Sequence, residues 1–397
     1  MVKRALQITS TASMIDQFII PDIKILISLG YKVDVASDFT SPGTITTERA
    51  EELKKYLNSI GVDVYDIGIP RAFSIKKLRQ AYNKVDDLLA KNNYSLLHCH
   101  SPFGGYIARK AARSRRKSGL KVIYTAHGFH FYKGAPIKNW LLFYPVEKHY
   151  SRYTDVLVTI NEGDFDRAKK KLYAGKTVKI PGVGVDTARF DPDNAANFAA
   201  GSDYKTIRHS KRGELGFSDD DFIVMSVGEL NANKNHQLVI NAIKDLPDVK
   251  YIIVGIGPLT EELKALALRL GVSDRVRFLG YRTDVRELLW ASDCFVFPSL
   301  REGLGLAAIE ALSAGLPIVA TNVGGIADYA SADTGIFCSG HGVQEYKNAI
   351  DKIASSERRA LYSDNCRKKA KEFDISVVDK IMTGIYKECT GGLNEEG

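Results

Sequence analysis

Short runs of β-branched and aliphatic residues alternate along the chain with longer segments of helical spacing. In the first half they predict strands at Val2–Ile8, Lys32–Ala36, Val62–Ile67, Ser95–His100, Lys121–Ala126 and Asp155–Ile160. In the second half they predict strands at Phe222–Val227, Lys250–Val254, Val276–Leu279, Cys294–Phe297, Pro317–Ala320 and Gly335–Phe337. Intervening helical segments, such as Gln237–Asp245, Thr260–Leu270 and Ala307–Ala314, predict parallel sheets with helices on both faces. The chain is therefore expected to be an α/β protein of two Rossmann-like, doubly wound domains.

The length supports two domains, because 397 residues exceed the roughly 250–300 over which a single core grows. We expect a first domain over residues 1–185 and a second over 186–374, with the junction near Ile180–Asp186. The polar segment Asp191–Arg212 has weak periodicity and is expected to be a surface excursion. The apolar spacing of Val378, Ile381 and Ile385 predicts a tail helix over residues 375–390.

Composition excludes several classes of protein. A hydrophobic fraction of 45% and a charged fraction of 26% are typical of a globular chain and exclude wholesale disorder. The five cysteines contain no C-x-x-C pair, so neither a disulfide framework nor a zinc ribbon is predicted, and a reducing compartment fits. No stretch reaches about 18 uncharged apolar residues, so neither a signal-peptide core nor a membrane span is predicted.

Charge is unevenly distributed along the chain. Residues 1–185 carry 30 Lys and Arg against 16 Asp and Glu, whereas the remainder is mildly acidic. The densest basic cluster comprises Arg109, Lys110, Arg113, Arg115, Arg116 and Lys117. Such a cluster suits an anionic lipid surface, a diphosphate or nucleic acid, or is simply a solvated helix face. Because no aromatic residues are interleaved to stack on bases, nucleic acid is the weaker interpretation.

The strongest motif is REGLGLAAIE, residues 301–310, which follows the predicted strand Cys294–Phe297. A strand, a glycine-rich loop and a helix start form an arrangement that binds phosphate through free N–H groups and the helix dipole. The alternative is a purely structural role, as a βα turn with a capping glutamate. If residues 302–310 were all helical, Glu302 and Glu310 would lie roughly 12 Å apart. The two carboxylates of a glycoside hydrolase lie closer together, so the spacing does not favour a hydrolase.

Two further segments carry candidate side chains. In SVGELNANKNH, residues 226–236, Lys234 follows a strand end and could reach a diphosphate, or it could be a surface lysine. In YTAHGFHF, residues 124–131, His127 lies at a strand end where open α/β sheets bind ligands, or it could be a core histidine. His130 is expected to be structural.

Three other patterns are set aside. Gly255–Thr260 lacks the third small residue of a dinucleotide-binding loop. His98 and His100 share one face of a strand, but no third metal ligand is spaced nearby, so no metal is predicted. The triplet Asp219–Asp221 directly precedes an apolar strand and is expected to form a turn.

Taken together, these motifs resemble the retaining glycosyltransferases of family 4, which have the GT-B fold of two Rossmann-like domains facing across a cleft. Glu302 and Glu310, Lys234, VGIGP at 254–258 and FLGYRTDVRELLWASD at 278–293 carry the resemblance in the second half. In the first half, LLHCHSPFGGYIAR at 96–109 and YTAHGFHFYKGAPIKNWLLFYPVEK at 124–148 resemble bacterial exopolysaccharide and capsule glycosyltransferases.

The resemblance implies a role for each matching residue. Glu310 would bind the nucleotide ribose, Glu302 and His127 the donor sugar, and Lys234 the diphosphate. The remaining donor-binding positions would be Gly303, Leu304, Gly305 and Leu306 along the diphosphate, Gly280, Tyr281 and Arg282 along the nucleobase, and Asn231 near the phosphates. The tail helix would pack back on the first domain. No metal or cofactor is expected beyond a nucleotide sugar, for which UDP is favoured.

The implied partners are a polyprenyl-diphosphate-linked saccharide, the anionic inner face of the cell membrane and other polysaccharide-assembly proteins. Two departures stand out: Glu229 occupies the position where the family often has an arginine phosphate clamp, and Thr9–Thr11 replaces a glycine-rich loop. Asn231, Asn233 and Arg301 are the candidates to compensate for the missing clamp. The alternatives are a nucleotide-sugar epimerase and a non-catalytic membrane-bound scaffold.

Overall fold

The computed structural model describes residues 2–70, 73–199, 202–355, 359–389 and 391. It divides into two compact units. Unit 1 extends to Val183 and also includes the chain from Ser376 onward, whereas unit 2 comprises Gly184–Ile375. Each unit contains one parallel sheet with helices on both faces, which confirms the predicted α/β fold class.

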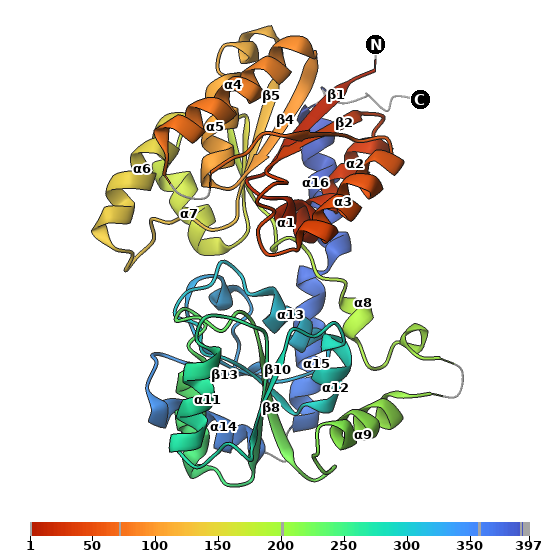
Figure 1. Cartoon of the computed structure of the whole chain (residues 1–397), viewed down its shortest axis with the longest axis vertical. Helices are drawn as coiled ribbons and strands as arrows, with labels where there is room; N and C mark the ends of the chain where they lie inside the picture. The colour runs from red at the N-terminus through yellow and green to blue at the C-terminus, as the bar shows by residue number, and fades with distance from the viewer. Residues whose placement is uncertain (1, 71–72, 200–201, 356–358, 390, 392–397) are drawn as a thin grey trace. The chain divides into compact units, whose positions relative to one another are not determined.

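Unit 1 is built on a seven-stranded sheet in the order β3-β2-β1-β4-β5-β6-β7 (Figure 1). Its strands are β1 (Arg4–Ile8), β2 (Lys32–Ser37), β3 (Asp63–Asp66), β4 (Tyr94–His100), β5 (Lys121–Ala126), β6 (Val156–Thr159) and β7 (Lys176–Lys179). Its helices are α1 (Ala12–Met14), α2 (Ile20–Ser28), α3 (Thr47–Ser59), α4 (Ile75–Lys91), α5 (Pro102–Ala112), α6 (Ile137–Ser151), α7 (Glu162–Lys171) and α16 (Ile375–Cys389). The central strands β1, β4 and β5 are almost wholly buried, and the residues they bury include the polar side chains of Gln7, His98, His100 and Thr125.

Unit 2 is built on a six-stranded sheet in the order β10-β9-β8-β11-β12-β13. Its strands are β8 (Phe222–Val227), β9 (Val249–Val254), β10 (Val276–Gly280), β11 (Cys294–Phe297), β12 (Ile318–Thr321) and β13 (Gly335–Cys338). Its helices are α8 (Thr187–Phe190), α9 (Tyr204–Glu214), α10 (His236–Ala242), α11 (Thr260–Arg269), α12 (Val285–Ala291), α13 (Leu306–Ser313), α14 (Val343–Ala354) and α15 (Arg359–Ala370).

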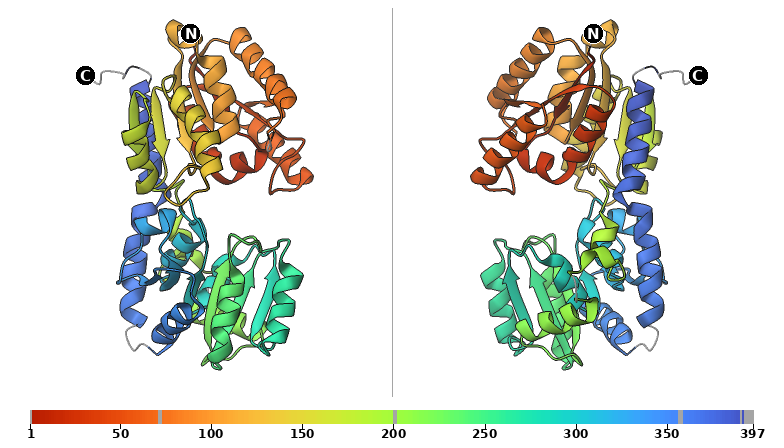
Figure 2. Two further views of the ribbon diagram at one scale, coloured as in Figure 1. Left: turned by 90° about the vertical axis from the view of Figure 1, so that its left-hand side faces the viewer. Right: turned by 90° about the vertical axis from the view of Figure 1, so that its right-hand side faces the viewer.

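The C-terminal helix α16 lies beside β7 in both views of Figure 2. Lys176 of β7 forms an ion pair with Glu388 of α16, with Nζ and Oε2 2.5 Å apart. Tyr386 of the same helix is fully buried and hydrogen-bonds His98 of β4 across the sheet. The final helix therefore contributes buried polar side chains to the interior of unit 1.

Two elements were not predicted from the sequence. Strand β7 has lysines at both ends and lies at the sheet edge, so it lacks an apolar run. Helix α9 falls in the segment expected to be a surface excursion, and that expectation is wrong from Tyr204 onward. Two of its inward side chains are Arg208 and Arg212, which both bind Asp293, with N–O distances of 2.6 and 2.7 Å. Charge pairing replaces the apolar stripe that normally reveals a helix.

None of the helices in the described part of the chain combines the length and apolar character needed to cross a membrane.

Candidate functional site

The carboxyl ends of β8 and β11 form the topological switch point of the unit 2 sheet. β8 pairs with β9 on one side and with β11 on the other, which is the place where open α/β sheets bind ligands. The two following loops are tied together, because the Leu300 N–H donates to the Asn233 carbonyl at 2.8 Å and Asn233 Nδ2 donates to the Arg301 carbonyl at 3.0 Å. Lys234 and Glu302 lie on these two loops.

The loop after β11 leads directly into helix α13. Gly305 is the N-cap residue with a φ of 85°, a left-handed conformation that glycine adopts without strain, and no side chain caps the helix. A Cβ at Gly305 would lie 2.5 Å from the ring of Phe297, so the loop also passes too close to β11 for a side chain. The predicted positions 303–306 therefore form a tight turn into an uncapped helix N-terminus, which suits an anion.

A second loop packs its backbone against this turn. A Cβ at Gly324 would lie 2.1 Å from the Glu302 carbonyl oxygen, and one at Gly325 would lie 2.0 Å from the Gly303 carbonyl oxygen. The Gly325 N–H donates to the Glu302 carbonyl at 3.2 Å. Close backbone contact with the loop after β12 thus fixes the position of Glu302 and Gly303.

Lys234 and Glu302 form an ion pair with Nζ and Oε1 2.6 Å apart. The Lys234 ammonium also lies 4.7 Å from the centre of the Phe297 ring. Its stem passes over Gly228, where a Cβ would approach Lys234 Cε to 3.1 Å. The structure therefore brings together two residues that the sequence singled out separately, at the amino end of α13.

The loop that carries Lys234 is shaped by side-chain amides. Asn231 Oδ1 accepts from the Lys234 backbone N–H at 3.0 Å, and Asn231 Nδ2 donates to Glu229 Oε2 at 2.9 Å. Glu229, which replaces the family's arginine clamp, is exposed. The half-buried Arg301 is the cation that adjoins Glu302 in the other loop.

Glu310 lies in the second turn of α13 and is half-buried. Burial raises the pKa of its carboxyl group to about 7, and the positive charge of Arg189 partly offsets this rise. Arg189 belongs to the short helix α8, which packs beside α13. Glu310 can therefore change its charge near neutral pH.

The segment Gly280–Arg282 ends β10. Gly280 has a φ of 65°, and its carbonyl accepts from the Gly255 N–H at 2.8 Å. The Tyr281 side chain is exposed, whereas Arg282 forms ion pairs with Asp284 at 2.6 Å and Glu214 at 3.0 Å. Of these three positions, Tyr281 presents the accessible side chain.

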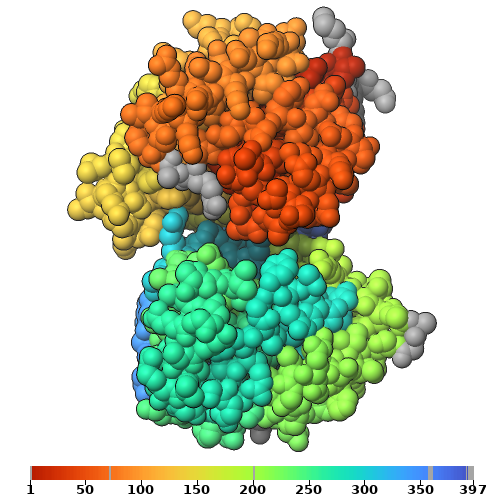
Figure 3. All heavy atoms as spheres, in the orientation of Figure 1, coloured from red at the N-terminus to blue at the C-terminus, as the bar shows by residue number. Residues whose placement is uncertain are grey.

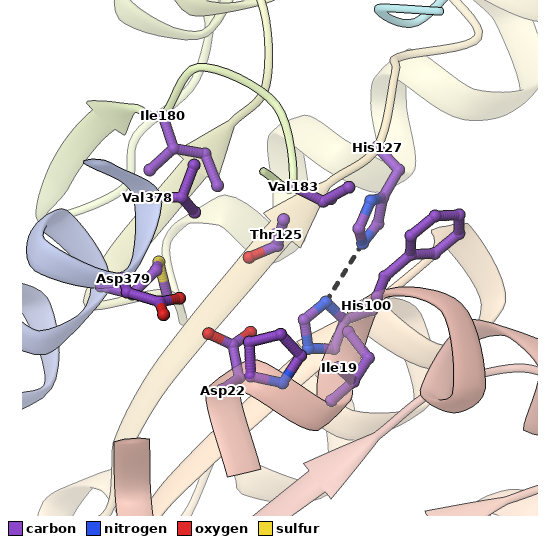
Figure 4. A pocket seen from close by; sticks show the side chains of 12 residues that line it. Ile19, Asp22, His100, Thr125, His127, Ile180, Val183, Val378 and Asp379 are labelled. Atoms are coloured by element: carbon purple, nitrogen blue, oxygen red, sulfur yellow. Dashed lines mark hydrogen bonds between the residues drawn. The ribbon is translucent and has the colours of Figure 1, made fainter. Parts of the chain in front are cut away.

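His127 lies in unit 1, just after β5. It lines a pocket together with residues of α2 and α16 (Figure 4). Its Nε2 lies 3.2 Å from His100 Nδ1, and its ring lies 6.0 Å from that of Phe18. Burial lowers the pKa of His127 to about 4. The imidazole is therefore neutral at physiological pH.

Behind His127 lies a cluster of two histidines and one acid, and the acid, Asp22, was not singled out from the sequence. Asp22 of α2 brings a carboxylate oxygen within 4.8 Å of ligand atoms of His98 and His100, a grouping that could hold a metal. The four ring nitrogens of the two histidines already have hydrogen-bond partners, namely Tyr386, Thr125, His127 and Gln7. The arrangement therefore satisfies its polar atoms as a hydrogen-bond network. Asp22 interrupts an apolar run, which is the signal that could have identified it.

The basic cluster 109–117, which begins in α5 and extends beyond its C-terminus, differs from the expected membrane-facing surface. Arg109 is only 1% exposed, and its guanidinium donates to Glu147 at 2.9 Å, so the prediction that it faces a membrane is wrong. Arg115 pairs with Asp86, and Arg116 pairs with Asp155 at 2.8 Å. The exposed members are Lys110, Arg113 and Lys117.

Residues 207–373 match the family "Glycosyl transferases group 1", and residues 23–161 match "Glycosyl transferase 4-like". A galactosyltransferase of Escherichia coli, named UDP-Gal:alpha-D-GlcNAc-diphosphoundecaprenol alpha-1,3-galactosyltransferase, is 31% identical over 75% of this chain and 76% of its own length. The chain belongs to the family 4 glycosyltransferases.

Another relative of the glycosyltransferase is EpsD of Bacillus subtilis, which is named as a glycosyltransferase. The two are 43% identical over 61% of this chain and 62% of EpsD, so the match spans less than two thirds of that protein. Among solved structures, Anabaena HepE in complex with UDP-glucose has a TM-score of 0.76 at 18% identity, covering 97% of this chain and 99% of its own. This likeness confirms the GT-B fold.

Proposed function

We propose that this glycosyltransferase moves a hexose or N-acetylhexosamine from a UDP-sugar to a polyprenyl-diphosphate-linked saccharide, with retention of configuration and without a metal. The observation that carries the proposal is the Lys234–Glu302 pair at the amino end of α13. The named activity of the Escherichia coli relative, which transfers galactose from UDP-Gal to a lipid-linked acceptor, supports the choice of substrate classes.

The unit 2 site supplies electrostatic stabilisation of a leaving diphosphate. The N-terminus of α13 and the Lys234 ammonium offer positive charge where negative charge develops on the leaving group. A bound diphosphate competes with Glu302 for Lys234, which releases the Glu302 carboxylate to hydrogen-bond a donor sugar. Glu310 accepts from the ribose hydroxyls, and the exposed Tyr281 ring stacks on the base.

We further propose that helix α6, and not the basic cluster 109–117, meets the membrane. Ile137, Leu141 and Leu142 are 77, 71 and 65% exposed, and all three lie on α6. Figure 3 shows α6, in yellow, at an outer edge of unit 1. Exposed apolar side chains on a helix are a common means of docking at a lipid interface.

The charges around α6 favour an anionic surface. Lys133 and Lys138 beside the apolar group are exposed. From Phe131 to Tyr153 the sequence has one acidic residue, Glu147, and it is buried against Arg109. Apolar contact with the acyl region and attraction of lysines to anionic headgroups would then act together.

The catalytic proposal is tested by screening radiolabelled sugar nucleotides against polyprenyl-diphosphate-linked saccharides. Label transferred to the lipid-linked product supports it. Conversion of the donor without an acceptor would indicate an epimerase, and absence of UDP binding by calorimetry would indicate a scaffold; either result overturns the proposal.

The membrane proposal is tested by vesicle flotation. Leu141→Ser with Leu142→Ser should abolish binding, and Lys133→Glu with Lys138→Glu should remove the preference for anionic lipid. Leu268→Ser on α11, which is 71% exposed in unit 2, is the matched control and should bind as the wild type does. Equal binding of the wild type to neutral and anionic vesicles, or unchanged binding of the α6 variants, would contradict the proposal.

A further inference from the structure

A continuous chain of hydrogen bonds crosses the interior of unit 1 and ends at His127. It joins Asp22 of α2, Tyr386 of α16, Gln7 of β1 and His100 of β4. Asp22, His100 and His127 all line the pocket in Figure 4, where a dashed line joins the two histidines. Because these groups are largely screened from water, the position of each proton is dictated by its neighbours.

The first proton is assigned by Tyr386. Its hydroxyl hydrogen-bonds the Asp22 carboxylate, which has no proton to donate when ionised, so the tyrosine is the donor. The Tyr386 oxygen must then accept from its other neighbours. These are Gln7 Nε2 at 3.4 Å and His98 Nδ1 at 2.8 Å. His98 consequently carries its proton on Nδ1 and accepts from Thr125 through Nε2, 2.8 Å from Oγ1.

The orientation of the Gln7 amide settles the remaining protons. With Nε2 directed at Tyr386, Gln7 presents Oε1 to His100 Nε2 at 3.1 Å, and that nitrogen must be the donor. A neutral imidazole has a single N–H, so His100 Nδ1 is an acceptor. It accepts from His127 Nε2 at 3.2 Å. The His127 proton therefore lies on Nε2.

We infer that Gln7, His100 and Tyr386 are positioning residues that hold His127 in the Nε2–H tautomer, so that Nδ1 accepts a hydrogen bond from a substrate hydroxyl. No residue in the described ranges hydrogen-bonds that Nδ1. The use of the lone pair rests on the proposed glycosyl transfer, in which hydroxyl-bearing sugars reach the pocket. The tautomer itself depends on the network alone.

Nitrogen-15 NMR of histidine-labelled full-length protein tests the tautomer, because protonated and unprotonated ring nitrogens differ in chemical shift. Burial raises the pKa of Asp22 to about 7, so its carboxyl is mostly ionised at pH 8. At that pH, wild-type His127 should show a proton on Nε2 and none on Nδ1. Gln7→Leu removes the amide bridge and should give a mixture of tautomers. Gln7→Glu keeps an acceptor facing His100 and should retain the wild-type pattern.

Tyr386→Phe keeps the packing of α16 while removing the hydroxyl, and serves as a second variant should Gln7→Leu fail to fold. It should also give mixed tautomers. A proton on Nδ1 of wild-type His127, or an unaltered tautomer in every folded variant that breaks the network, overturns the inference.

Measurements of kcat and of UDP affinity distinguish failure of this inference from failure of the proposed function. Gln7→Leu should lower kcat about tenfold, as expected for loss of one hydrogen bond in the transition state, while UDP affinity stays unchanged because UDP binds unit 2. Gln7→Glu should restore most of kcat. A protein with the predicted tautomer and no transfer activity would refute the proposed function but not the positioning network. Unchanged kcat in a variant with a mixed tautomer would refute the role of Nδ1.

Discussion

Lys234 and Glu302 lie 68 residues apart in the chain, yet their Nζ and Oε1 atoms are 2.6 Å apart at the amino end of α13. Both side chains are largely buried, so their charges are only weakly screened by water. Each charge of the pair neutralises the other, and in the proposed reaction a diphosphate takes the place of Glu302 beside Lys234.

Replacing Glu302 with glutamine should separate binding from turnover. Removing the carboxylate leaves Lys234 unopposed, so UDP should bind as tightly as in the wild type or more tightly. Glycosyl transfer should fall by about 10²-fold or more, the cost of losing a group that acts on the reacting sugar. Calorimetry with UDP and initial-rate assays measure the two effects, and Glu261→Gln on the surface of α11 is the control. Weaker UDP binding without loss of transfer would contradict this role.

UDP binding should strengthen as pH rises through neutrality. Burial raises the pKa of Glu310 to about 7, so its carboxyl is mostly protonated at pH 6 and ionised at pH 8. The ionised form accepts from the ribose hydroxyls, so affinity should rise by about tenfold over this range. Because UDP itself titrates near pH 6, the Glu310→Gln variant is the essential control. A wild-type pH profile identical to that of Glu310→Gln would contradict the assignment.

The same titration should affect stability with a definite sign. The folded protein holds the Glu310 proton up to about pH 7, whereas the unfolded chain releases it near its ordinary pKa of 4.5. The free energy of unfolding should therefore decrease as pH rises through this window. The decrease should be smaller in Glu310→Gln, as measured by urea unfolding of both proteins at pH 5 and pH 8.

Gly325→Ala should disrupt the loop that carries Glu302. Its Cβ would lie 2.0 Å from the Gly303 carbonyl oxygen, which forces the backbone apart at a cost of about 1–3 kcal/mol. UDP binding should weaken accordingly. In helix α9, nothing outside the adjoining helix backbone lies within 4 Å of a Cβ added at Gly213. Gly213→Ala should therefore leave UDP binding and thermal stability intact. Calorimetry and thermal melting check both variants; normal UDP binding by Gly325→Ala would be inconsistent with the loop geometry.

Arg109 should prove to be a structural residue. Its guanidinium donates to Glu147, lies 4.0 Å from the centre of the Tyr124 ring and is buried. Arg109→Met leaves a buried carboxylate without its cation and should cost about 3–5 kcal/mol in the free energy of unfolding. Adding Glu147→Gln should recover part of that loss. Urea unfolding measures both, and a loss below about 1 kcal/mol would place the pair among weak surface ion pairs.

Much of the fold could be predicted from sequence because apolar runs are local signals. The strands Lys121–Ala126, Phe222–Val227 and Cys294–Phe297 have the predicted bounds. Helix α9 escaped prediction because two of its inward side chains are arginines whose partner, Asp293, lies 81 residues beyond Arg212. Pairing over such a separation leaves no periodic trace in the sequence.

The sequence predicted individual residues of the site but not the contacts between them. Lys234 and Glu302 each followed a strand end, which indicated the correct edge of the sheet, but their ion pair depends on the order of strands β8 and β11. Neither Gln7 nor Tyr386 was singled out, since one lies in a strand and the other in a tail helix 379 residues away. The Arg109 prediction failed because charge density along the chain does not reveal which way a side chain faces.

The most direct test of the central claim is a calorimetric titration of UDP into the wild type and into Lys234→Ala, with Lys264→Ala on α11 as the control. We expect the wild type and Lys264→Ala to bind UDP, and we expect Lys234→Ala to raise Kd by about 10- to 100-fold, the effect of losing a charged hydrogen bond. Failure of the wild type to bind UDP, or equal affinity in Lys234→Ala, would contradict the claim.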